Sequence, residues 1–398
     1  MKKILALLLA VVMVFGLAAC GGSSEETEAT EAATEAATEA TEAATLPEET
    51  QEAVEAADMK VAMITDYGDI TDQSFNQTTY EAGKAWCEEN GVDYSYYKPS
   101  GDSSAERVAM IDAAVADGYN VILMPGYAFG EAISMTADMY PDVTFVALDV
   151  SEGDLGDYTL PSNAFSAVYQ EELSGYMAGY AAVKLGYKHL GYLGGMAVPA
   201  VLRFGYGFLQ GVDAAAVELG IAEEVTVEYV YGNQFYGDAD ITAVMDTWYG
   251  EMGVECVFAC GGGIYTSAAE AAAKVGGKVI GVDVDQAAII DGQYGEGMTV
   301  TSAMKGLAAT VKTLLSEIAA GNFANYGGQV LTLGLVSENP EENYVQIAPS
   351  TQYEDGKFTE EDYKALVAGM LSGEIAVSNA IDAMPEVSVV VNEHPNIK

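Results

Sequence analysis

Five predicted strand ends carry residues suited to ligand binding. The ends are Asp66 after "MIT", Gly126 and Tyr127 after "ILMP", Asp149 after "FVAL", the triple glycine 261–263 (with Gly262 at its centre) after "CVFAC" and Asp283 after "VIGV". In parallel sheets, ligands bind beyond the carboxyl ends of the strands. An aspartate there can instead simply cap the next helix, but five polar or glycine-rich ends together favour one binding cleft.

The longest of these loops, "DYGDITDQSFNQTTYEAG" (residues 66–83), follows the apolar run "KVAMIT". It offers a carboxylate at Asp66, an aromatic face at Phe75 and, at Asn76, an amide that both donates and accepts hydrogen bonds. Asp72 or Ser74 would cap the following helix. Capping alone is the alternative role for Asp72, and a place in the core is the alternative for Phe75.

The segments that must position these residues alternate between short apolar runs and amphipathic stretches. Residues 60–150 follow the order β-α-β-α-β-α-β, and the pattern restarts at "KHLGYLGGM" and continues to "GLAATVKTLLSEIAAG". Strands rich in Val, Ile and Leu are typical of parallel sheets covered on both faces. We therefore predict an α/β fold with two lobes of similar size.

The first 58 residues do not read as part of this fold. A basic "MKK" and an apolar run ending in "LAAC" predict a signal peptide at residues 1–20. Small residues before Cys20 resemble a bacterial lipobox, in which the cysteine is lipidated; an ordinary cleavage site is the alternative. Residues 21–58 hold twelve acidic and no basic side chains, which predicts a disordered acidic tether. The protein would then be lipid-anchored on the extracytoplasmic face of the cell membrane.

Net charge limits the partners of the remaining chain. Residues 59–398 contain 48 acidic and 14 basic side chains. Nucleic acid and anionic lipid surfaces both require a positive footprint, so we expect neither as a partner of this part. A neutral or cationic small molecule is the expected ligand.

Histidines and cysteines give no sign of a metal or cofactor site. The chain has only His189 and His394, and Cys87, Cys256 and Cys260 are its cysteines besides Cys20. Positions i and i+4 of a strand are roughly 13 Å apart, too far for a disulfide within "CVFAC". We expect these three cysteines to be packing residues, with no metal and no cofactor bound.

Several motifs together resemble a known family. They are "ITDYGDITDQSFNQTTYEAGK", "EELSGYMAGYAA", "LGYLGGMAVPAVLRFGYGFLQG", "CVFACGGG", "VIGVDVDQ" and "TVTSAMK". In this order, over about residues 60–330, the chain resembles the basic membrane protein or purine-nucleoside-receptor family of ABC transporter solute-binding lipoproteins. The resemblance implies a type I periplasmic-binding-protein fold, with two Rossmann-like lobes joined by a three-strand hinge.

The resemblance also implies lobe boundaries and a function. Lobe 1 would comprise residues 59–162 and 303–325, and lobe 2 residues 163–302 and 326–398. The protein would capture a nucleoside, purine by preference, in the cleft, close by hinge motion and deliver the ligand to an ABC permease. No catalytic step is implied.

Individual roles follow from the resemblance. Phe75 would stack on the base, with Tyr265 on the opposite face, and Asn76, Asp66 and Asp149 would contact the base edge. Asp283 would bind the ribose, with Lys305 as its partner cation. A purely structural ion pair is the alternative for these last two. Arg203 is left open between a ligand contact and a surface charge.

Departures from the family pattern at "LRFGY", "GGGIY" and "MPGYAFG" lie at the expected cleft. They affect ligand identity more than fold. A receptor for a sugar or another small solute is one alternative, and a sensory co-receptor is another. A nucleoside-cleaving enzyme is a third, but the chain has no Gly-x-Ser-x-Gly elbow and no P-loop, so we expect no enzyme.

Overall fold

The computed structural model describes residues 44, 46 and 58–398. The predicted signal peptide with Cys20, and nearly all of the predicted tether, lie outside the described residues. No helix in the described part of the chain combines the length and apolar character needed to cross a membrane.

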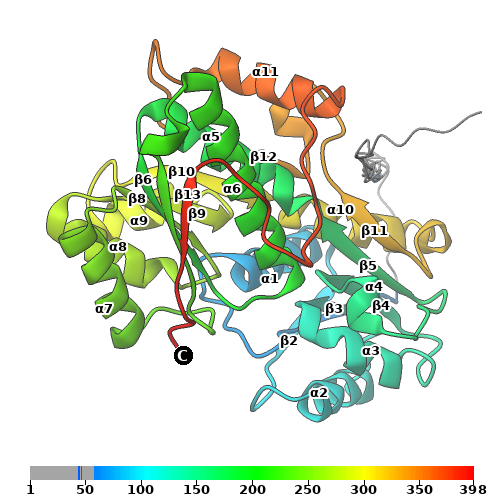
Figure 1. Ribbon diagram of the computed structural model, residues 1–398. Coiled ribbons are helices and arrows are strands. Elements are labelled where there is room, and N and C mark those ends of the chain that lie inside the picture. The colour runs from blue at the N-terminus through cyan, green and yellow to red at the C-terminus, as the bar shows by residue number, and fades with distance from the viewer. Residues whose placement is uncertain (1–43, 45, 47–57) are drawn as a thin grey trace, which may run out of the picture. The chain divides into compact units, whose positions relative to one another are not determined.

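The first sheet has six strands, each parallel to its neighbours, in the order β11-β5-β4-β3-β1-β2. They are β1 (Lys60–Ile64), β2 (Asp93–Tyr97), β3 (Val121–Pro125), β4 (Thr144–Leu148), β5 (Ala164–Tyr169) and β11 (Val330–Leu333). Its helices are α1 (Phe75–Asn90), α2 (Ser104–Ala116), α3 (Gly130–Thr136), α4 (Glu152–Leu155) and α10 (Leu307–Ala319) (Figure 1).

Alternate side chains of β1 enter two separate cores, because successive residues of a strand point to opposite faces. Val61 and Met63 belong to the large cluster that includes Trp86 of α1. Ala62 and Ile64 belong to the cluster that includes residues of α2 and α3. The sheet is therefore covered on both faces, as its continuous apolar strands predict.

The second sheet has seven strands in the order β12-β10-β9-β8-β6-β7-β13. Only β12 runs antiparallel to its neighbour. The strands are β6 (His189–Gly194), β7 (Thr226–Tyr231), β8 (Cys256–Cys260), β9 (Lys278–Asp283), β10 (Thr299–Lys305), β12 (Val345–Ile347) and β13 (Val390–Glu393). The helices are α5 (Glu171–Leu185), α6 (Pro199–Leu219), α7 (Ala239–Thr247), α8 (Tyr265–Val275), α9 (Ala287–Tyr294) and α11 (Glu360–Leu371).

Three adjacent segments carry the chain between the sheets: β5 to α5, β10 to α10, and β11 to β12. Hydrogen bonds join them. The N–H of Gln170 donates to Leu333 O at 2.9 Å, that of Gly306 to Tyr344 O at 2.7 Å and that of Tyr344 to Gly334 O at 3.0 Å. The predicted fold, two α/β lobes joined by a three-strand hinge, is confirmed.

Sheet membership corrects the predicted lobe boundaries. The predicted change of lobe between residues 162 and 163 precedes β5, yet β5 pairs within the first sheet. All of β10 pairs within the second sheet, so that crossing falls at Gly306 and not at residue 303. β11 pairs with β5, which moves the third crossing beyond Leu333. Short apolar runs near a hinge do not reveal which sheet they join.

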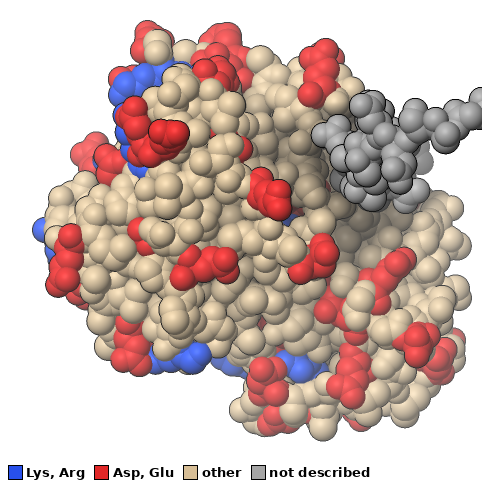
Figure 2. Space-filling view, viewed as in Figure 1, with Lys and Arg blue, Asp and Glu red and all other residues tan. Residues whose placement is uncertain are grey.

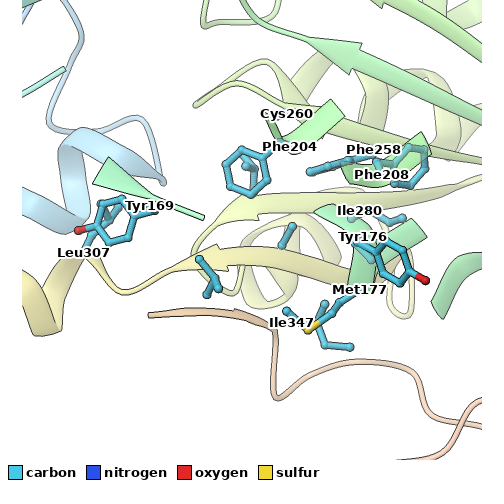
Figure 3. Packing of buried hydrophobic residues seen from close by; sticks show 14 of the residues in the cluster. Tyr169, Tyr176, Met177, Phe204, Phe208, Phe258, Cys260, Ile280, Leu307 and Ile347 are labelled. Carbon is cyan, nitrogen blue, oxygen red and sulfur yellow. The ribbon is translucent and has the colours of Figure 1, made fainter. Parts of the chain in front are cut away.

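Helices α5 and α6 approach each other closely through glycines. A Cβ added at Gly207 would lie 2.1 Å from Glu172 O, and one at Gly211 would lie 2.0 Å from Tyr176 O. Aromatic residues of α6 then pack on the sheet, where Figure 3 shows Phe204 and Phe208 near Phe258. The ring centroids of these two lie 6.0 and 5.4 Å from that of Phe258.

Candidate functional site

A cavity lies between the carboxyl ends of the two sheets. About 90 Å³ of it is open to the centre of a water molecule, which is room for several waters at roughly 10–15 Å³ each. Eight of the nine predicted ligand residues line it: Asp66, Phe75, Asn76, Tyr127, Asp149, Gly262, Asp283 and Lys305. Their contact with a ligand stays a prediction.

Asp66 follows β1 and is held by the backbone of its own loop. Its Oδ1 accepts hydrogen bonds from the N–H groups of Tyr67 at 2.7 Å and Gly68 at 2.9 Å. Burial raises the pKa of the Asp66 carboxyl above its usual value, although these bonds oppose the rise. A Cβ added at Gly126 would lie 2.6 Å from Asp66 Oδ2, and Gly126 has a φ of 128°. Both space and backbone conformation therefore require glycine there.

The start of α1 presents Asn76 to the cavity. Asp72 accepts hydrogen bonds from the backbone N–H groups of Ser74, Asn76 and Gln77 at 2.9–3.0 Å, so its capping role is confirmed. Ser74 occupies the N-cap position but makes no side-chain cap. Asn76 Nδ2 donates to Asp72 at 3.1 Å, and Asn76 Oδ1 is buried without a partner in the described chain. A ligand donor there would offset the cost of about 1–3 kcal/mol for an unpaired buried group.

Asp149 and Asp283 end equivalent strands of the two sheets. Both have a left-handed backbone, with φ of 64° and 65°, a conformation that aspartate adopts more readily than most residues. Burial raises the pKa of both carboxyls, that of Asp149 to about 6, although Lys305 opposes the rise. Among the described residues, Asp149 Oδ1 has no hydrogen-bond partner.

Lys305, at the end of β10, is the cation of the cavity wall. Its side chain is 3% exposed, and its Nζ lies 2.5 Å from Asp149, 3.4 Å from Glu171 and 3.8 Å from Asp283. Burial alone would lower the pKa of this ammonium, but the three carboxylates raise it. Lys305 was expected to be the partner of Asp283, but the shortest contact of Lys305 Nζ is with Asp149.

Glu171 and Arg203 extend this charge network behind the cavity. Arg203 Nε donates to Glu171 Oε2 at 2.6 Å, and Glu171 is fully buried. Arg203 is therefore an internal ion-pair partner and not a plain surface charge. Sequence reasoning did not select Glu171, although it lies in the quoted motif "EELSGYMAGYAA".

Aromatic side chains reach the cavity from both lobes. Phe75 lines it from the first lobe, with Lys305 Nζ 4.7 Å from the ring centroid. Phe235 lines it from the second lobe, in the loop after β7, and its O accepts a hydrogen bond from Gly263 N at 2.9 Å. The Phe235 centroid lies 6.5 Å from that of Tyr67. Phe235 was not predicted from the sequence. The segment that contains it, "GNQFYG", directly follows β7, so it lies at a strand end as the predicted site residues do.

The expectation that Tyr265 faces the cavity is wrong. Tyr265 begins α8, is 3% exposed and packs in the second lobe's apolar cluster with Ile264 and Ala268. It does not line the cavity. The second-lobe aromatic residues that do are Phe204, on α6, and Phe235.

Metal chemistry finds no support in the described part of the chain. No group of three or more His, Cys, Asp or Glu side chains there is placed to hold a metal ion. Cys87, Cys256 and Cys260 are buried free thiols, as predicted for packing residues.

Figure 2 shows acidic side chains spread over the visible face, with far fewer basic ones.

Two α/β lobes joined by three crossing segments, with a cavity between them that is lined by aromatic rings, carboxylates and one ammonium group, are the architecture of a two-lobed solute-binding protein. Residues 59–366 match the model of the Bmp family, described as PnrA-like ABC transporter substrate-binding proteins. The chain belongs to this family, and the resemblance found in its motifs is confirmed.

Relatives agree with this assignment. The chain is 28% identical over 330 residues to the ABC transporter nucleoside-binding protein BmpA of Lactococcus lactis subsp. cremoris (strain MG1363), a match covering 76% of this chain and 89% of that protein. It is 27% identical over 283 residues to Basic membrane protein B of Borreliella burgdorferi (strain ATCC 35210 / DSM 4680 / CIP 102532 / B31), covering 70% and 78%. A solved ABC transporter solute-binding protein from Aeropyrum pernix K1 superimposes with a TM-score of 0.61 and 22% identity, covering 80% of this chain and 87% of that one. This last likeness concerns the fold alone.

Proposed function

We propose that this protein captures a purine nucleoside in the cavity between its lobes and delivers it to an ABC permease. The observation that carries the proposal is the pair of acceptors on the cavity wall that have no partner among the described residues, Asn76 Oδ1 and Asp149 Oδ1. Both accept N–H donors, which a purine base carries on its edge.

Phe75 and Phe235 support a flat ligand. Phe75 lines the cavity from the first lobe, and Phe235, together with Phe204, lines it from the second, so a base held between the lobes meets aromatic side chains from either side. An aromatic pair contributes about 0.5–1.5 kcal/mol beyond the buried area. Asp66 is a further acceptor near the base.

Asp283 and Lys305 suit a ribose. A carboxylate such as Asp283 accepts hydrogen bonds from two vicinal hydroxyl groups, and Lys305 opposes the rise that burial causes in the pKa of this acid. Tyr127 offers a hydroxyl on the first lobe, and Gly262, with a φ of 53°, lets the ligand approach the backbone. No cofactor is required.

We propose that the lobes close on the ligand by bending at the three crossings. Sheet membership assigns residues 59–169 and 307–333 to lobe 1, and residues 171–305 and 345–398 to lobe 2. Closure expels water from the cavity and creates the surface that the permease binds.

The chain ahead of the fold supports a lipid anchor on Cys20 at the extracytoplasmic face of the membrane. Residues 21–58 were predicted as the tether, but Ala44 N donates a hydrogen bond to Thr332 O and Leu46 is buried in the core, so the proposed tether is the part that precedes Ala44. Mass spectrometry of the protein purified from membranes tests this: a diacylglyceryl group on Cys20 is expected. Release of Cys20→Ala protein into the medium would agree, and an unmodified Cys20 in the native protein would contradict it.

Calorimetric titration and thermal shift of the purified protein with adenosine, guanosine, inosine, uridine, free bases, ribose and galactose test the ligand. A nucleoside at a hundred times its dissociation constant stabilises by about 2.7 kcal/mol. Stabilisation by purine nucleosides, weakened by Asn76→Ala, supports the proposal. Stabilisation by sugars alone would replace it with a sugar receptor.

Two further outcomes separate the remaining alternatives. If chromatography shows that the protein releases free base from a bound nucleoside, the protein is a nucleoside-cleaving enzyme. Nucleoside binding without nucleoside uptake by the cells would favour a sensory co-receptor.

A further inference from the structure

The segment that precedes α1 touches the second lobe beside the cavity. Ser74 Oγ donates a hydrogen bond to Asp283 Oδ2 at 2.6 Å, and its distance to Val282 O is 3.4 Å. One residue earlier, Gln73 O accepts a hydrogen bond from Gln286 Nε2 at 3.1 Å. Two consecutive residues of the first lobe therefore bind the end of β9 and the loop after it.

The Ser74 hydroxyl is available for this contact because Asp72 caps the helix. Asp72 Oδ1 accepts from the N–H groups of Ser74 and Gln77, and its Oδ2 accepts from that of Asn76. Ser74 is fully buried at the N-cap position and makes no cap of its own. The hydroxyl group of a serine at the N-cap usually accepts a hydrogen bond from a backbone N–H of the helix. Here it instead donates a hydrogen bond to Asp283 of the other lobe.

Asp283 is held from two directions. Ser74 donates to Oδ2, while Lys305 Nζ lies 3.8 Å from Oδ1. A hydrogen bond to an ionised carboxylate is about twice as strong as one between neutral groups. The Ser74 contact therefore fixes the rotation of the Asp283 carboxyl group.

The second-lobe side of the contact is rigid. Gln286 is 1% exposed, its Oε1 accepts from Val282 N at 3.0 Å and its N–H donates to Ser302 Oγ at 3.1 Å. Gln73 has a φ of 57°, a left-handed backbone that directs its carbonyl group to Gln286. Both sides of the contact are thus built into the local structure.

We propose that Ser74 is a positioning residue: its hydroxyl orients the Asp283 carboxylate and joins the first-lobe half of the site, Phe75 and Asn76, to the second-lobe half. The two halves then bind a single ligand as one unit. The ligand itself rests on the proposed function, a purine nucleoside. The contact between Ser74 and Asp283 does not.

Three variants test this role. Ser74→Ala removes the hydroxyl, and Ser74→Thr keeps it. Ser166→Ala is the matched control, because Ser166 is equally buried and its hydroxyl donates to Val150 O within the first lobe, so that no bond between the lobes is lost. Each is compared with the wild type in two measurements: calorimetric titration with inosine, and hydrogen–deuterium exchange of the ligand-free protein.

Ser74→Ala should weaken inosine binding by up to about tenfold, because Asp283 is no longer held in the orientation in which it binds the ribose. It should also speed amide exchange in residues 282–286 and 73–78 of the ligand-free protein, while exchange in the core strands stays unchanged. Ser74→Thr should restore most of both properties, and Ser166→Ala should match the wild type in both.

Unchanged exchange in residues 282–286 of Ser74→Ala, or an unchanged inosine affinity, would overturn the proposal. If the wild type binds no nucleoside, the proposed function fails, and exchange in the ligand-free protein still decides the role of Ser74. If the threonine methyl group does not fit, the comparison of Ser74→Ala with Ser166→Ala decides it.

Discussion

Asp149 and Asp283 occupy equivalent places in the two lobes and share one cation. Asp149 directly follows the parallel strand β4 and Asp283 is the last residue of the parallel strand β9, with φ of 64° and 65°, and Lys305 Nζ lies 2.5 Å from Asp149 and 3.8 Å from Asp283. A left-handed backbone at a non-glycine residue costs about 1–3 kcal/mol. The fold carries this cost in both lobes at the residues that bring two acids to one ammonium group.

Lys305→Met should destabilise the protein by about 3–5 kcal/mol at pH 7, because it leaves buried carboxylates without their counter-charge. The loss should shrink at pH 5, because the pKa of Asp149, about 6 beside Lys305, rises further once the ammonium group is removed, and this carboxyl then takes up a proton. Urea unfolding at both pH values measures it. Lys364→Met is the control: Lys364 is exposed and pairs with Glu360 in α11, so its removal should cost less than about 0.5 kcal/mol. Equal effects of the two variants would contradict the prediction.

Glu172→Gln should stabilise the protein at alkaline pH. Glu172 is 3% exposed, its Oε2 has no partner in the described chain, and burial raises the pKa of its carboxyl from the ordinary 4.5 to about 8. The folded protein thus retains a proton that the unfolded chain releases, so the stability of the wild type falls as pH rises from 4.5 to 8, by about 1.4 kcal/mol per unit.

Glutamine cannot ionise, so the stability of the Glu172→Gln protein lacks this fall. Chemical unfolding at pH 5 and pH 8.5 should therefore show similar stabilities at the lower pH and a more stable variant at the higher one. A constant difference between the two proteins across this range would contradict the raised pKa.

Two glycine-to-alanine changes should have opposite signs. At Gly207 the new Cβ would lie 2.1 Å from the backbone oxygen of Glu172, which forces α5 and α6 apart and should cost about 2 kcal/mol or more. Gly292, in α9, has no heavy atom within 4 Å of the added Cβ, so alanine should stabilise by up to about 1 kcal/mol through helix propensity. The midpoint of urea unfolding measures both, and destabilisation by Gly292→Ala would disprove the argument.

Phe235→Ala should weaken purine-nucleoside binding about tenfold or more, because it removes both an aromatic contact and buried apolar area. Tyr265→Leu is the companion variant, because it removes the aromatic ring and keeps an apolar side chain: Tyr265 packs in the core and does not line the cavity, so affinity should stay unchanged. Titration calorimetry with adenosine and inosine distinguishes the two. A larger loss of affinity from Tyr265→Leu would return the stacking role to that residue.

Much of the cavity wall was predictable because of one topological rule. The carboxyl ends of parallel strands meet at one edge, so Asp66, Asp149 and Asp283, though far apart in the chain, had to approach each other once the sheets and lobes formed. The loop at 66–76 was recognisable as a binding loop because a simple connection between a strand and a helix does not need an aromatic residue and an amide, here Phe75 and Asn76, at its end.

Errors arose where a side chain has two possible directions. Tyr265 and Phe235 both flank glycine-rich loops, and only the packing of α8 shows that Tyr265 turns into the core. Ser74 had a local role available in helix capping, and sequence could not show that Asp72 would take it. Similarly, the sequence did not show that β5 and β11 belong to the first sheet, because they pair with each other across more than 150 residues of chain.

By itself, the sequence determined the alternation of strands and helices, the residues at the strand ends and the family, because these depend on local composition, periodicity and order. The tertiary structure alone decided which carboxylate Lys305 contacts, that Glu171 and Arg203 extend the charge network, and that Ser74 reaches Asp283. These are contacts between segments of more than a hundred residues' separation, apart from the pair of Glu171 and Arg203 on neighbouring helices. Their geometry depends on how the two lobes meet, which local sequence does not encode.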